Sequence, residues 1–263
     1  MKDYIAAEYQ AALKDRGLDN FESLWSLELP TVDQPNTERG GWSSVCRLEL
    51  DVNGESLGFY LKRQSNHCSY SWLRPFGEPT FAREFRSIRH YHKVGLPAPE
   101  VAYFAERKIS AGKQSILMTR ALDDFCPLSE LLLSWSGLTE TAREQVLDSI
   151  GATVAKMHGK RITHHCLYPK HIFINLSETL PKPELTLIDL EKARFQLLPK
   201  RERVADLEAL FRRADLWTES DRDRLLSAYV VNLPAAGKVS DYQRLLQKRN
   251  RKKLKGKKVS CAA

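Results

Sequence analysis

The sequence has no apolar stretch approaching the ~20 residues that a helix needs to span a bilayer. Residues 1–14 mix acids and polar residues into every apolar run, so we expect no signal peptide. The five cysteines are an odd number without a C-x-x-C pair, which argues against a disulfide framework or a zinc site. We therefore expect reduced thiols and a cytoplasmic protein, with 263 residues providing enough chain for two lobes.

A glycine-rich phosphate loop is also missing in its usual form, because G-x-G-x-x-G does not occur. Gly40 and Gly41 precede a strand pattern and stand where such a loop would cover the phosphates of a nucleotide. Two adjacent glycines are also the ordinary composition of a turn. Both interpretations stay open for this pair.

Acidic residues are absent after Asp241, where nine of the 41 basic residues lie. Residues 1–241 are therefore almost neutral, and residues 241–263 form a basic tail. A polybasic terminus near an anionic leaflet gains about 1 kcal/mol per residue, so this tail predicts a location peripheral to the inner membrane. Nucleic acid would attract the same charges, but no RNA-binding aromatic signature accompanies them, so we consider it an unlikely partner. A solvated, disordered tail is the remaining alternative.

The first half of the chain predicts a sheet with a lysine and a glutamate set to pair. Residues 45–52 and 57–62 alternate apolar with polar side chains around Asn53 and Gly54, which is a strong hairpin signal. Lys62 lies on the second strand, and Glu84 follows within a helix predicted over residues 80–94. Glu84 stands next to the predicted apolar face of that helix, which is marked by Phe81, Phe85, Ile88 and His92. A lone strand lysine is more often a solvated edge charge. Residues 4–13 predict a helix that packs on this lobe.

The second half carries the most informative pattern. Residues 139–158 predict a core helix, with Val146, Ile150 and Val154 on one face. An apolar strand over residues 185–188 then ends in Asp189. A carboxylate at a strand end suits a Mg²⁺ ion that bridges nucleotide phosphates. An ordinary aspartate in a turn is the common alternative. Before it, residues 164–171 read His-His-Cys-Leu-Tyr-Pro-Lys-His. Kinase loops read His-x-Asp-Leu-x-x-x-x-Asn, and here Cys166 stands at the aspartate position.

This loop resembles the lipopolysaccharide kinase family of the Kdo/WaaP type, in particular its InaA branch. Tyr168-x-x-His171-x-Phe173-Ile174 and Ile188-Asp189-Leu190 carry the resemblance, which covers about residues 36–215. It implies an α+β, two-lobed protein-kinase-like fold. The small β-rich N-lobe is expected over residues 1–118 and the larger helical C-lobe over 119–240. ATP and Mg²⁺ are the implied co-substrates, and the implied acceptor is a hydroxyl of a lipopolysaccharide core sugar, although other hydroxyl acceptors suit the same residues.

The resemblance also implies roles for single residues. Lys62 would bind the α- and β-phosphates with Glu84 holding it, and Asp189 would hold the metal together with His171, which stands at the position of the second metal-binding asparagine. Lys170 would lie by the γ-phosphate. For the proton of the acceptor hydroxyl, three possibilities remain: a Cys166 thiolate, His164 or His165, or no base at all.

Two alternatives stay open. The substitution at Cys166 also fits a non-catalytic, nucleotide-binding pseudokinase with a stress-response or scaffolding role, although positioning and charge neutralisation carry most of phosphoryl transfer. Asp206, in a helix predicted over residues 202–214, stands where kinase-like folds brace the catalytic loop, or else belongs to a charged helix face. The oligomeric state is not predicted.

Overall fold

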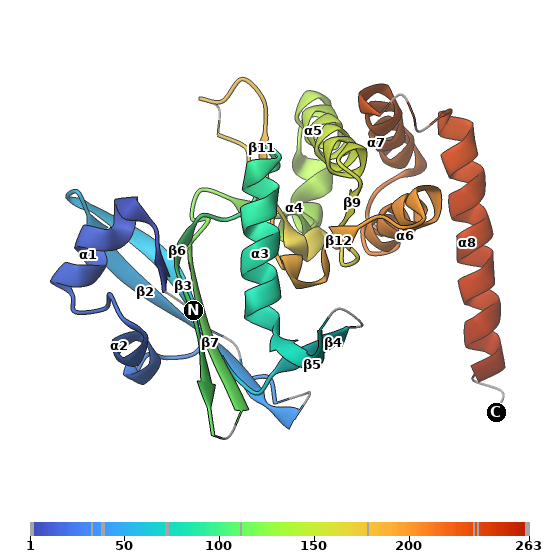
Figure 1. Cartoon of the computed structure of the whole chain (residues 1–263). Coiled ribbons are helices and arrows are strands. Elements are labelled where there is room, and N and C mark those ends of the chain that lie inside the picture. The colour runs from blue at the N-terminus through green and yellow to red at the C-terminus, as the bar shows by residue number, and fades with distance from the viewer. Residues whose placement is uncertain are drawn as a thin grey trace. The chain divides into compact units, whose positions relative to one another are not determined.

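The computed structural model describes residues 3–260 except 33, 38, 39, 72, 73, 111, 178, 234 and 236, and it leaves out the side chains of residues 71, 74 and 251–260. The chain divides into two compact units (Figure 1). Unit 1 comprises Met1–Lys93 and Ala98–Asp123, and unit 2 comprises Val94–Pro97 and Asp124–Ala263. Unit 1 extends to Asp123, a few residues beyond the N-lobe boundary expected at residue 118, because its last strand continues to Arg120.

Unit 1 is built on a five-stranded antiparallel sheet with the order β1-β6-β7-β3-β2. A separate hairpin, β4–β5, follows β3 and leads into helix α3. The elements are β1 (Tyr4–Ile5), α1 (Gln10–Asp15), α2 (Phe21–Ser26), β2 (Trp42–Val52), β3 (Glu55–Ser65), β4 (Cys68–Ser71), β5 (Arg74–Pro79), α3 (Thr80–Lys93), β6 (Val101–Ile109) and β7 (Gly112–Arg120).

The predicted hairpin is confirmed as β2 and β3, which pair from Trp42 and Ser65 down to Val52 and Glu55. The turn between them needs two residues with positive φ, and Asn53 and Gly54 have φ values of 56° and 86°. Both residue types adopt this conformation readily, which is why the dipeptide marks the turn. The strong local turn fixes the register of β3, and therefore the face to which Lys62 points.

Helix α3 confirms the predicted helix but buries a different face. Its buried residues include Glu84, Ile88 and Tyr91, which follow helical spacing, whereas His92 is exposed. Phe85 is half-buried because its ring stacks on Phe104 at a centroid distance of 4.1 Å. The face is thus rotated from the predicted one, and the rotation turns the Glu84 carboxylate inward.

The predicted N-terminal helix over residues 4–13 is wrong in its first half. Tyr4 and Ile5 form an edge strand paired with Phe104 and Tyr103 of β6. A short 3-10 helix, Ala7–Tyr9, and α1 follow. Pairing with an open sheet edge satisfies backbone groups that a two-turn helix would leave partly exposed. Sequence periodicity does not predict this pairing, because the partner strand lies far along the chain.

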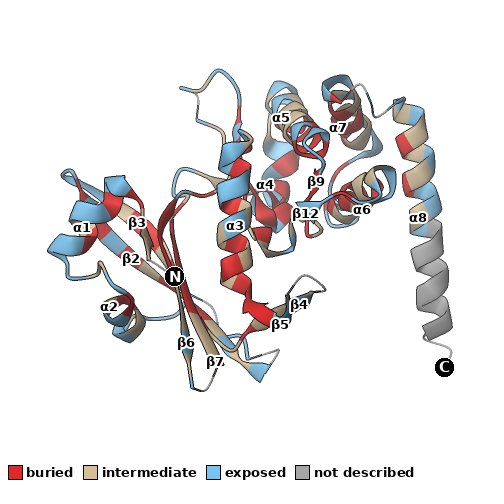
Figure 2. Ribbon diagram, viewed as in Figure 1, coloured by how far each residue is buried: buried red, intermediate tan, exposed pale blue. Residues whose placement is uncertain are grey.

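Unit 2 is mainly helical. Helix α5 (Glu140–Gly159) is capped by Thr139, whose side chain accepts a hydrogen bond from the Ala142 N–H, and it buries Val146, Ile150 and Val154 as predicted. Figure 2 shows buried stretches along this helix. The other elements are β8 (Cys126–Pro127), α4 (Leu128–Leu131), β9 (Ile162–Thr163), β10 (Ile172–Asn175), β11 (Glu184–Leu187), β12 (Arg194–Phe195), α6 (Pro199–Phe211), α7 (Glu219–Asn232) and α8 (Val239–Ser260).

The basic tail predicted from residue 241 begins as part of a packed helix. Tyr242 and Leu246 of α8 are buried, and Arg249 lies 3.5 Å from the buried carboxylate of Glu208. The basic side chains from Arg251 onward, and Cys261, lie outside the described residues. A solvated tail is therefore excluded for the first half of this segment, because Tyr242 and Leu246 are buried there.

The α+β class is confirmed, with a sheet-rich unit that precedes a helical one. No helix in the described part of the chain has the length and hydrophobicity to cross a bilayer.

Candidate active site

Lys62 and Glu84 form a close ion pair within unit 1. The Lys62 Nζ lies 2.6 Å from Glu84 Oε1, and the two side chains are 21% and 6% exposed. Lys62 is on β3, which lies between β2 and β7, so it is not an edge charge. A short, charge-assisted hydrogen bond from a central strand to a buried helix glutamate fixes the direction of the lysine side chain. The pairing that the sequence predicted is therefore present in the structure.

The two glycines have structural reasons of their own. A Cβ on Gly41 would lie 2.2 Å from the Ser65 carbonyl oxygen, so the backbone there approaches β3 too closely for any side chain. Gly40 adopts φ 73°, which glycine tolerates best. Both glycines are thus explained by the turn into β2, and a phosphate-covering role stays a prediction. The preceding Glu38 and Arg39 lie outside the described residues.

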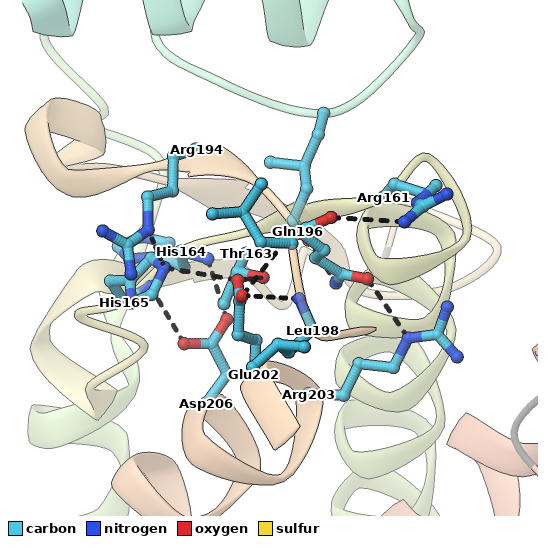
Figure 3. Close-up of polar contacts among 12 residues, drawn as sticks. Arg161, Thr163, His164, His165, Arg194, Gln196, Leu198, Glu202, Arg203 and Asp206 are labelled. Carbon is cyan, nitrogen blue, oxygen red and sulfur yellow. Dashed lines mark hydrogen bonds and ion pairs between the residues drawn. The ribbon is translucent and has the colours of Figure 1, made fainter. Parts of the chain in front are cut away.

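In unit 2, Asp206 of α6 holds the backbone of the predicted catalytic loop (Figure 3). Its carboxylate accepts hydrogen bonds from the His164 N–H at 2.8 Å and the His165 N–H at 2.9 Å. The side chain is 1% exposed, and His158 Nε2 lies 3.3 Å from Oδ2. This settles the alternatives for Asp206: it braces the loop rather than belonging to a solvated helix face.

Replacing Asp206 with asparagine is expected to lower the free energy of unfolding by about 3 kcal/mol. An amide presents a donor toward one of two buried backbone N–H groups, so at least one charge-assisted bond is lost and one donor is left unsatisfied. Urea denaturation followed by circular dichroism measures the loss. Asp215→Asn, at an exposed position of the same unit, is the matched control. A loss below ~1 kcal/mol would show that the loop does not depend on this brace.

The sequence pattern does not predict His158, which completes this arrangement, as a site residue. Its ring is fully buried, and Nδ1 lies 2.9 Å from the Tyr229 hydroxyl. Burial lowers the pKa of His158, so the ring is neutral at pH 7 and Nε2 can donate to Asp206. No spacing rule links a histidine at the end of one helix with an aspartate 48 residues later, because their contact arises only from helix packing.

His164 is fully buried, and its ring joins two parts of the site. Nε2 lies 3.0 Å from the Ile188 carbonyl oxygen, and Nδ1 accepts from the Cys166 N–H at 3.3 Å. Since the carbonyl only accepts, Nε2 carries the hydrogen and Nδ1 is the acceptor. Burial lowers the pKa of His164 as well. The predicted role of His164 as a base is therefore corrected: both nitrogens are used to tie the loop to the strand before Asp189.

His165 offers no better base. Its backbone is left-handed, with φ 64°, and its Nε2 lies 2.7 Å from Arg194 Nε, which can only donate. The lone pair that would accept a proton is thus occupied by a guanidinium. Glu202 Oε2 lies 3.7 Å from the same nitrogen (Figure 3). Of the three possibilities for the acceptor proton, a Cys166 thiolate and no base at all remain.

Asp189 and His171 meet as predicted for a metal site. His171 Nδ1 lies 2.8 Å from the Cys166 carbonyl oxygen, so Nδ1 carries the hydrogen, and Nε2 lies 3.2 Å from Asp189 Oδ2. Burial lowers the pKa of His171 to about 4, so the ring is neutral at pH 7 and Nε2 offers a lone pair. A lone pair and a carboxylate oxygen directed at one point suit a bound cation. These two residues fit the predicted metal.

The backbone of Asp189 is left-handed as well, with φ 57° and ψ 53°. Such a conformation costs a non-glycine residue about 1 kcal/mol, although aspartate tolerates it better than most. The 3-10 helix Leu190–Lys192 begins directly after it. The strained turn directs the carboxylate away from the strand axis and toward His171.

Cys166 is 4% exposed, and its neighbour is Tyr168. Burial raises the pKa of Tyr168, and its contact with Cys166 raises that pKa further. The guanidinium of Arg213 covers the Tyr168 ring at 3.6 Å. Lys170, in the 3-10 helix Pro169–His171, is exposed and has no ion-pair partner among the residues that the structure describes. Lys170 is thus available to an anion, whereas Cys166 is largely covered.

Comparisons with known proteins identify the family and the fold of the chain. The sequence profile of the lipopolysaccharide kinase (Kdo/WaaP) family matches residues 22–229. The protein InaA of Escherichia coli (strain K12) is 30% identical over 181 residues, which is 68% of this chain and 81% of InaA. A solved structure of WaaP in complex with acyl carrier protein superposes with a TM-score of 0.71 at 22% identity, covering 97% of this chain and 99% of WaaP. That likeness confirms the two-lobed protein-kinase-like fold. The chain belongs to the lipopolysaccharide kinase (Kdo/WaaP) family.

Proposed function

We propose that this protein is a phosphotransferase that moves the γ-phosphate of ATP to a hydroxyl of a lipopolysaccharide core sugar. The observation that carries the proposal is the Lys62–Glu84 pair at 2.6 Å, because a lysine on a central strand held by a buried glutamate is placed for a ligand rather than for solvent. Family membership supplies the reaction class and the acceptor class.

The residues have separate tasks in this proposal. Lys62, oriented by Glu84, binds the α- and β-phosphates of ATP. Asp189 and His171 hold Mg²⁺, which neutralises phosphate charge when bound. Asp206 and His164 hold the predicted catalytic loop, residues 164–171, in place. Lys170, exposed and without an ion-pair partner in the described part of the chain, binds the γ-phosphate as it leaves ATP.

The site has no well-placed base for the proton of the acceptor hydroxyl. A positioned base contributes typically ~10²- to 10⁴-fold to such a rate, and Cys166 is a poor substitute because its side chain is mostly covered. The same observation favours the second candidate function, a nucleotide-binding pseudokinase with a stress-response or scaffolding role. Both candidates use Lys62 and Asp189 for nucleotide, and only the first turns over.

Transfer of labelled phosphate from ATP to dephosphorylated lipopolysaccharide core tests the proposal, with Mg²⁺ present and wild type compared with Cys166→Asp. We expect slow transfer by wild type and faster transfer by the variant, because aspartate restores the group that takes the hydroxyl proton. Cys126→Asp, at a half-buried cysteine elsewhere in unit 2, is the control and is expected to give no gain. Tight ATP binding without transfer by either protein would favour the pseudokinase.

The basic helix α8 supports a location at the inner-membrane surface, as the sequence predicted. Arg244 and Lys248 are exposed, although Arg244 also pairs with Asp241, and Arg249 is engaged with Glu208. Exposed cations on one helix gain energy near anionic headgroups. WaaP has been solved in complex with acyl carrier protein, so a carrier protein is a further candidate partner of this chain.

A further inference from the structure

An exposed apolar segment follows the predicted metal ligand in unit 2. Phe195, Leu197 and Leu198 are 57%, 77% and 56% exposed, only six to nine residues after Asp189. Three large apolar side chains so close together are uncommon on a surface without a binding role. We call these three residues, with the exposed cations around them, the apolar-basic platform. The cations are Lys160, Arg161, Lys192, Arg194, Lys200 and Arg201.

The platform is held in one conformation. Gln196, between the exposed residues, is fully buried, and its N–H donates to the Arg161 carbonyl oxygen at 2.7 Å. The N–H groups of Leu197 and Leu198 donate to Glu202 Oε1 at 3.1 and 3.0 Å (Figure 3). Every backbone donor from Gln196 to Leu198 is thus satisfied within the protein. The leucines are presented to solvent by a fixed backbone, which lowers the entropy cost of docking them into another surface.

The cations of the platform are not explained by internal contacts alone. Lys200 and Arg201 lie in the first turn of α6, where positive charge opposes the helix dipole. Arg161 covers the Phe195 ring at 4.8 Å, so its charge lies beside the apolar group. Glu202 accepts hydrogen bonds from two N–H groups, and Lys192 pairs with Glu191 at 3.8 Å. Five exposed cations therefore remain with the three apolar side chains. Such a surface complements a partner that is both anionic and apolar.

We propose that the apolar-basic platform docks the protein on an anionic lipid bilayer. Apolar side chains that enter the headgroup–acyl boundary, with cations on the lipid phosphates, form the usual physical pattern of interfacial binding. Strand β12 of the platform pairs with β9, directly before His164. Docking therefore brings the predicted catalytic loop to the lipid surface. If the proposed phosphotransfer holds, its acceptor is a lipid-anchored sugar, and only this last step rests on the proposed function.

The test is binding of the full chain to vesicles of phosphatidylcholine with phosphatidylglycerol. We expect Leu197→Ser/Leu198→Ser to weaken the partition at least tenfold, since each leucine contributes by burial in lipid. Lys200→Gln/Arg201→Gln should weaken it about tenfold or more at low salt. The matched controls are Leu133→Ser and Val231→Ser, which are 80% and 77% exposed elsewhere in unit 2 and should bind as wild type. All variants keep α8, so its charges do not distinguish them.

Depth of insertion gives a second measurement. The fluorescence that the new tryptophan of Leu197→Trp adds to the wild-type signal should be quenched by lipids brominated in their acyl chains. The fluorescence added by Leu133→Trp should not be quenched. Equal vesicle affinity in platform and control variants, or no difference in quenching, overturns the proposal. If the platform variants lose binding to acyl carrier protein while their vesicle binding is unchanged, the platform serves a protein partner instead, and the proposal is overturned as well.

The two proposals fail separately. Transfer to a detached core sugar, without lipid, reports on phosphotransfer alone. Vesicle binding without any transfer supports the platform and removes the kinase, whereas transfer with unchanged vesicle binding by Leu197→Ser/Leu198→Ser removes the platform only.

Discussion

Asp189→Asn is expected to lower phosphate transfer at least ~10³-fold while the protein stays folded. The loss follows because an amide keeps the shape of the side chain but not the charge that would hold Mg²⁺ beside His171, and a metal ion supplies several kcal/mol of charge stabilisation in phosphoryl transfer. Asparagine also tolerates the left-handed backbone at this position, so little folding energy changes.

The measurement is the initial rate of transfer at saturating ATP over a range of Mg²⁺ concentrations, beside a thermal melt of each protein. Asp215→Asn, an exposed acid of the same unit, should keep the wild-type rate. An unchanged rate in Asp189→Asn would assign the metal to other residues. Retained binding of ATP without Mg²⁺, together with lost binding of Mg-ATP, would locate the defect at the metal.

Lys62→Met is expected to reduce transfer by ~10²- to 10³-fold and, independently, to destabilise unit 1 by about 2–3 kcal/mol. The activity falls because the cation for the ATP phosphates is gone. The stability falls because the Glu84 carboxyl group, 6% exposed, loses the ammonium that lies 2.6 Å away in the wild type.

The double variant Lys62→Met/Glu84→Gln separates the two effects. A neutral amide at position 84 needs no cation, so the double variant should regain stability to within ~1 kcal/mol of wild type and remain inactive. Chemical denaturation measures the first quantity and phosphate transfer the second. Lys93→Met, at an exposed position of α3, controls for the loss of a surface charge. Recovery of transfer in the double variant would mean that Lys62 serves folding only.

Local signals in the sequence predicted much of the fold. Asn53-Gly54 specifies its turn by backbone sterics, and the spacing of Val146, Ile150 and Val154 marks the buried face of α5. These features depend on neighbours within a few residues, which is why a single sequence is enough to find them.

The misses have a common physical origin. Tyr4 and Ile5 form a strand because an edge of the sheet was open to them, and α3 turns Glu84 inward because Phe85 stacks on Phe104 of a distant strand. In both cases a partner far along the chain decided the outcome. Helical periodicity does not contain that information.

The sequence by itself determined the family, the α+β class and the residues that resemble a kinase site, because these are carried by motifs and by short-range preferences. The tertiary structure alone decided what those residues are free to do. It formed the predicted pair of Lys62 and Glu84 and decided between the two alternatives for Asp206. It also occupied the nitrogens of His164 and covered Cys166. The physical reason is that a hydrogen bond or a buried side chain depends on distance in space, and groups 22 to 42 residues apart meet only when the chain has packed.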